Sequence, residues 1–163
     1  GLFSGRFCIE IVMYSRSEAS RIRAEFWITF GQYMKPVPNA EGRRINWPNY
    51  RTGVKDIYFR MKAEQEFASI GIEITHKDEE LQELFFEQFK ELKNLLKSSL
   101  EEDWDWKLFA TNEVGQVVSK IEKILPGVNV MEESDWADII SFLKPRIIAL
   151  DEFWDNVKPG FED

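Results

Sequence analysis

The sequence has very few of the residues that cross-link a chain or bind transition metals. Cys8 is the only cysteine and His76 the only histidine among its 163 residues. A disulfide within the chain needs two cysteines, and zinc, iron and copper sites normally use several Cys or His ligands. Such sites are therefore excluded within one chain, and any metal would have to be bound by carboxylates.

Long apolar segments are also missing. No run approaches the roughly 18 apolar residues that span a bilayer, and no charged start leads into an apolar stretch with a small-residue cleavage site. We therefore expect a cytoplasmic protein without a membrane partner. The length of 163 residues suits one domain that can bury its own core. We expect a single domain over residues 1–163, in which residues 1–13 are an N-terminal extension or an added strand.

Positive charge is scarce overall but unevenly distributed. The formal net charge is -8, which argues against a surface that attracts nucleic acid everywhere. Residues 1–62 carry 11 Lys and Arg against 5 Asp and Glu, whereas residues 63–163 carry 10 against 24. We therefore expect one basic side and one acidic side, or else a generally acidic protein whose charges are all solvated.

Helical and strand-like periods alternate along the chain. Ser15 and Glu18 have the spacing of a capping box, and apolar residues then recur with a helical period until Pro36. A β-hairpin, a second amphipathic helix, two more strands and a last helix follow. The predicted elements span about residues 15–34, 57–61, 68–74, 78–100, 105–111, 117–124 and 134 onward. This order predicts an α+β fold, with helices packed on an antiparallel or mixed sheet.

The hairpin contains a pair of acids. If its apolar residues face the core, Asp56 and Glu73 share the opposite face. Closing the hairpin with residues 63–66 places the two acids directly opposite each other. Like charges in that position are destabilising, so we expect a nearby base, a protonated carboxyl or a bound divalent cation to compensate. A slip of two residues would leave them as diagonal neighbours on the same face.

Basic and aromatic residues gather just before and within the hairpin. They are Arg43, Arg44, Trp47, Tyr50, Arg51, Lys55 and Arg60. Such a set can form a platform, because aromatic rings stack on bases while basic groups meet phosphates. In the alternative interpretation, Trp47 and Tyr50 pack over the edge of the sheet and the arginines pair with the acidic second half.

The acid pair resembles the motif of restriction-endonuclease-like nucleases, which places an acid on one strand and Glu-x-Lys on the next. The resemblance implies that Asp56 and Glu73 hold magnesium in a catalytic site, and that Glu25 on the first helix could add a carboxylate. Thr75 stands where the family has its lysine. The match is therefore incomplete, and outside this reading we expect no cofactor.

A broader resemblance covers most of the chain from Tyr14 onward. The segments "YSRSEASRIRAEFWITFGQYM", "RINWPNYRTGVKDIYFRM", "ELQELFFEQFKELK" and "DWDWKL" resemble a prokaryotic family of unknown function, number 4268 in the domain-of-unknown-function series. The resemblance implies a discrete domain and no particular chemistry. Our leading hypothesis is a non-catalytic interaction module that binds a protein partner, a second copy as a homodimer, or nucleic acid. The alternative is a degenerate or variant magnesium-dependent nuclease.

Overall fold

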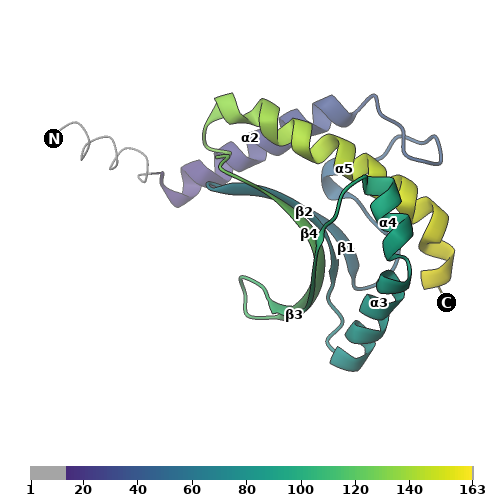
Figure 1. The fold of residues 1–163 in the computed structure, drawn as a ribbon. Helices are drawn as coiled ribbons and strands as arrows, with labels where there is room; N and C mark the ends of the chain where they lie inside the picture. Colours follow the sequence, from purple (N-terminus) through teal and green to yellow (C-terminus); the bar gives the residue numbers. More distant parts are fainter. Residues whose placement is uncertain (1–13, 163) are drawn as a thin grey trace.

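The computed structural model describes residues 14–162 and confirms an α+β fold (Figure 1). The helices are α2 (Arg16–Met34), α3 (Glu79–Glu91), α4 (Lys93–Leu100) and α5 (Trp136–Val157). The strands are β1 (Ile57–Ala63), β2 (Phe67–Ile74), β3 (Asp105–Thr111) and β4 (Val117–Pro126). All neighbouring strands are antiparallel, in the order β1-β2-β4-β3, so β1 and β3 form the edges of the sheet. The predicted extension at residues 1–13, with Cys8, lies outside the described residues.

The first helix begins and ends where the sequence predicts. The Ser15 hydroxyl oxygen accepts a hydrogen bond from the backbone N–H of Glu18 (3.1 Å), and so caps a free donor of the first turn. The second predicted helix is wrong in one respect, because residues 78–100 form two helices rather than one. The chain leaves the helical conformation at Leu92, between α3 and α4.

The sheet is curved, and the helices cover its convex face (Figure 1). Ile70 and Ile72 of β2 and Ile121 of β4 are fully buried beneath the helices. Gly71 faces the concave side, where a Cβ atom would lie 2.9 Å from both the Cβ of Glu122 and the carbonyl oxygen of Ile121. Only glycine therefore fits at this point, where β2 and β4 approach each other closely.

The two edge strands differ in regularity. β1 pairs with β2 through an unbroken register from Ile57 to Ala63. The register of β3 with β4 shifts between Lys107 and Ala110, and Phe109 within that bulge has a left-handed backbone (φ 57°). This local irregularity affects only the β3 edge.

No helix within residues 14–162 combines the length and apolar character needed to cross a membrane. The longest helix, α5, has 22 residues and includes several charged side chains.

Candidate partner-binding groove

The loop from residue 35 to residue 56 packs its aromatic side chains onto the core. Trp47 is 1% exposed, and its indole N–H donates to the carbonyl oxygen of Val37 (2.9 Å). The ring of Tyr50 stacks on Phe59 of β1, with 5.2 Å between the ring centroids. Trp47 therefore presents no face on which a base could stack, and this part of the predicted platform is wrong. The burial has a simple cause, since a large aromatic surface is more stable against the core than in water.

The 35–56 loop is tied to the C-terminal half of α5. Asp151 is buried, and its carboxylate accepts hydrogen bonds from the Tyr50 hydroxyl (2.6 Å) and the Ala40 backbone N–H (2.7 Å). The indole N–H of Trp154 donates to the Thr52 carbonyl oxygen (2.8 Å). Burial, together with the bond to the Asp151 carboxylate, raises the pKa of the Tyr50 phenol well above its usual range. These contacts fix the loop beside β1.

The two predicted metal-binding acids do not face each other. Glu73 lies opposite Tyr58, and the Asp56 carbonyl oxygen instead accepts from the backbone N–H of Thr75 (2.9 Å). The predicted register is therefore wrong by two residues, and the alternative of a two-residue slip is the one observed. Asp56 precedes β1 in a left-handed conformation (φ 63°), and an Arg60 nitrogen lies 3.8 Å from the Glu73 carboxylate.

The three predicted acids also do not gather in one place. Glu25 on α2 is bonded to Arg21 (2.8 Å), and α2 lies on the convex side, away from the face that carries Glu73 (Figure 1). Across residues 14–162, no three Asp, Glu, His or Cys side chains are placed so that they could hold a metal ion. The predicted set of Asp56, Glu73 and Glu25 is therefore not brought together as three ligands of one ion. The nuclease resemblance is unconfirmed.

A groove of about 520 Å³ runs between the 35–56 loop and the outer edge of β1, and we call it the β1 groove. Its floor includes Phe59 and Met61, and its basic lining residues are Arg51, Lys55 and Arg60. All three basic residues are exposed. Neither Arg51 nor Lys55 forms an ion pair with another described residue. The groove therefore carries uncompensated positive charge.

The predicted binding residues are divided by this arrangement. Tyr50, Arg51, Lys55 and Arg60 line the β1 groove, whereas Arg43 and Arg44 are exposed elsewhere on the loop. The structure thus brings four of the seven predicted binding residues together in one groove.

A neighbouring cavity of about 560 Å³ lies on the other side of the loop, against the end of α5. Its lining contains Arg51 and Lys158 together with Glu41, Asp155 and Glu162. With Asp151, the lining has four acids against two bases, so this cavity does not favour a negatively charged ligand.

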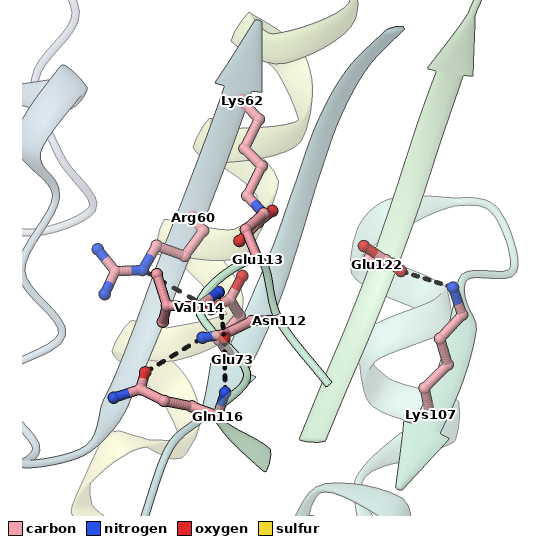
Figure 2. Close-up of polar contacts among 9 residues, drawn as sticks. All are labelled: Arg60, Lys62, Glu73, Lys107, Asn112, Glu113, Val114, Gln116 and Glu122. Atoms are coloured by element: carbon pink, nitrogen blue, oxygen red, sulfur yellow. Dashed lines mark hydrogen bonds and ion pairs between the residues drawn. The ribbon is translucent and has the colours of Figure 1, made fainter. Parts of the chain in front are cut away.

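Two lysines on the concave face are paired with acids, as Figure 2 shows. Lys62 of β1 lies 2.7 Å from Glu113 of the β3–β4 turn, and Lys107 of β3 lies 2.8 Å from Glu122 of β4. The turn therefore reaches across the concave face to the opposite edge strand. Lys62 and Lys107 are thus neutralised, whereas Arg51 and Lys55 at the β1 groove form no ion pair with any residue from 14 to 162.

A family model described as "Domain of unknown function (DUF4268)" matches residues 22–158. The chain belongs to the DUF4268 family. Comparisons with curated proteins and with solved structures gave no match. The matched part of this DUF4268 chain contains the 35–56 loop, β1 and Asp151, so the whole β1 groove lies inside the family domain.

Two features of the DUF4268 groove were missed by sequence reasoning. Asp151 anchors the loop, and a signal for it exists because an acid interrupts the apolar stripe of Ile147, Leu150 and Trp154. No sequence signal indicates that the outer edge of β1 is free, because the order of strands in a sheet cannot be inferred from the residues of one strand.

Proposed function

We propose that this DUF4268 domain is a non-catalytic interaction module that binds a negatively charged partner in the β1 groove. The observation that carries the proposal is the uncompensated positive charge of Arg51 and Lys55 beside an open groove. The chain as a whole has a formal charge of -8, so its net charge repels acidic molecules. A local basic patch on such a protein selects where an acidic partner docks.

The charge arrangement supports binding rather than catalysis. Glu73 has Arg60 beside it and Lys120 opposite it on β4, so its charge is offset by bases. The Glu25 carboxylate is likewise bonded to Arg21. An acid whose charge is offset in this way has less tendency to bind a metal cation.

The test compares two triple charge reversals with equal changes in net charge. The first is Arg51→Glu, Lys55→Glu and Arg60→Glu in the groove. The control is Lys90→Glu, Lys93→Glu and Lys97→Glu on α3 and α4, where Lys93 lies over Trp106 of the opposite edge strand. The probes are a labelled peptide of alternating Glu and Val and a labelled single-stranded oligonucleotide, and binding is read from fluorescence anisotropy.

We expect at least one acidic probe to bind, with an affinity that falls as salt rises. The groove triple should weaken binding at least about tenfold at low salt, while the control triple changes it little. Equal weakening by both triples, or no binding of any acidic probe, would contradict the proposal. Magnesium-dependent cleavage of the oligonucleotide that is lost in Asp56→Asn would instead restore the nuclease alternative.

A further inference from the structure

The outer edge of β1 carries backbone groups that point away from the sheet. At one end of the strand the Asp56 carbonyl oxygen accepts a hydrogen bond from the Thr75 N–H, and at the other end the Glu64 N–H donates to the Phe67 carbonyl oxygen. The backbone groups of even-numbered residues therefore point toward β2. Backbone groups alternate sides along a strand. Those of Ile57, Phe59 and Met61 must therefore point outward, toward the β1 groove.

The 35–56 loop already uses the first of these outward positions. Ile57 N–H donates to the Val54 carbonyl oxygen (3.3 Å), and the Thr52 hydroxyl donates to the Ile57 carbonyl oxygen (2.7 Å). The outward groups of Phe59 and Met61 have no partner among residues 14–162, and both residues line the groove. Among the described residues, the backbone N–H and C=O groups of Phe59 and Met61 are thus free to bond with another strand.

The rest of β1 is suited to accept another strand. It is seven residues long, contains no proline and keeps one register throughout. Bulges, prolines and short lengths are the usual devices that prevent a strand from pairing at an edge, and β1 has none of them. Its remaining protection is the positive side chains of Arg60 and Lys62. Lys62 is already paired with Glu113 (2.7 Å), whereas Arg60 has only a longer contact with Glu73 (3.8 Å), so an acidic strand would chiefly neutralise Arg60.

We infer that the β1 groove binds an extended acidic peptide of a protein partner, which pairs with Phe59 and Met61 as a fifth strand of the sheet. The inference rests on the proposed function and specifies its partner. Side chains of an added strand alternate between the two sheet faces. Those on the concave side lie next to Arg60, which has no ionic contact among residues 14–162 shorter than 3.8 Å, and should be acidic. Those on the convex side lie next to Met61 and should be apolar.

A second copy of this chain fits the edge less well. An antiparallel pair of β1 strands centred on Met61 would place Arg60 opposite Lys62, and one centred on Arg60 would place two arginines together. Like charges directly opposite each other are destabilising. A nucleic acid matches the charge, but it lacks the alternating N–H and C=O groups that pair with a strand edge.

The experiment uses capped heptapeptides of alternating Glu and Val as the probe. Two N-methylated versions of the peptide are the decisive reagents. One is methylated at the odd-numbered residues and the other at the even-numbered residues, so only one of them loses the backbone N–H groups that face β1. A peptide of the same composition with Glu and Val in two blocks is the sequence control. Hydrogen exchange of the protein amides is followed by NMR with and without peptide.

We expect the alternating peptide to bind at least about tenfold more tightly than one N-methylated version and about as tightly as the other. Binding should slow the exchange of the Phe59 and Met61 amides at least about tenfold. The Arg60 amide already bonds within the sheet and should change little. The variant with Arg51→Glu, Lys55→Glu and Arg60→Glu should no longer bind the Glu-Val peptide and should bind a Lys-Val peptide more tightly than the parent does.

Several results would overturn the inference. If acidic probes bind but both N-methylated peptides match the parent and Phe59 and Met61 exchange is unchanged, the proposed function stands and the added strand is wrong. Slow exchange of these two amides in the free protein would show that the edge is already occupied. Binding of the oligonucleotide alone would identify a nucleic-acid partner instead. If no acidic probe binds, the proposed function fails together with the inference.

Discussion

The two edges of the sheet are protected from other strands in different ways. At β3 the protection lies in the backbone, because the register shift and the left-handed Phe109 interrupt the row of hydrogen-bonding groups. At β1 the backbone is regular. The 35–56 loop covers Ile57, and the side chains of Arg60 and Lys62 stand beside the rest of the strand. A backbone bulge disfavours pairing with any additional strand, whereas charge disfavours only strands of the same sign. The difference indicates which edge is available to a partner.

The supports behind the two edges also differ. The loop beside β1 is held by the Asp151 carboxylate on α5, 101 residues further along the chain than Tyr50. At the β3 edge, the backbone N–H of Phe109 donates to the Ser119 hydroxyl (3.1 Å), which in turn donates to the side-chain oxygen of buried Gln82 on α3 (2.7 Å). Both edges are thus fixed to a helix by a buried polar side chain, but only Asp151 carries a charge.

The largest effect is expected from Asp151→Ala, which removes the support on the β1 side. Hydrogen bonds to a charged group contribute about 1.5–3 kcal/mol each, and Asp151 accepts one from Tyr50 and one from Ala40. We expect the free energy of unfolding to fall by about 3 kcal/mol or more, measured by urea denaturation. Glu152→Ala, at an exposed neighbouring position, is the control. A loss below about 1 kcal/mol would show that the loop does not depend on Asp151.

A smaller effect is expected from pH, again on the β1 side. The pKa of Tyr50 is higher in the folded protein than its ordinary value of 10.0, so the unfolded chain releases the phenol proton first as pH rises. The stability that protonated Tyr50 contributes is therefore complete below about pH 10 and is lost above it, by at most about 1.4 kcal/mol per pH unit. The Tyr50→Phe variant has no phenol to titrate at this position, so it should not show this loss of stability above about pH 10.

The measurement is the difference in unfolding free energy between the parent and Tyr50→Phe, taken between about pH 9 and about pH 11. The stability advantage of the parent should shrink across this range. A difference that stays constant with pH would mean that Tyr50 does not titrate differently in the folded and unfolded states.

The smallest effect concerns the β3 edge, where Phe109→Gly and Phe109→Ala both remove the aromatic ring. At φ 57° glycine has no steric penalty, whereas alanine retains a cost of about 1 kcal/mol. We expect the glycine variant to be the more stable of the two by about that amount in urea denaturation. Equal stability would argue that the backbone at the bulge is not strained. Gly115, which already has a positive φ in the adjoining turn, shows the conformation that glycine tolerates.

Much of the fold could be predicted from the sequence, because periodicity and capping are local. β3 occupies residues 105–111 as predicted, and α2 begins after its Ser15 cap. The hairpin register could not be fixed in the same way. Alternation determines the face of each side chain but not its partner, since a slip of two residues leaves every side chain on its face. The break at Leu92 likewise has no proline or glycine to indicate it.

The candidate site was only partly predictable for the same reason. Arg51, Lys55 and Arg60 could be grouped because they are close in sequence, and they do line one groove. Whether Trp47 is exposed or buried depends on Val37 and on the core beneath it, which no local pattern specifies. The free edge of β1 depends on strand order, and strand order is set by contacts between distant segments.

The tie between the 35–56 loop and α5 has a consequence for biosynthesis. The loop leaves the ribosome long before Asp151 and Trp154, which hold it in place. We expect a nascent chain that ends before residue 151 to lack a formed groove, even though all of its basic residues have already been made. If the domain binds an acidic partner as we propose, that binding would begin only once translation of the domain is complete.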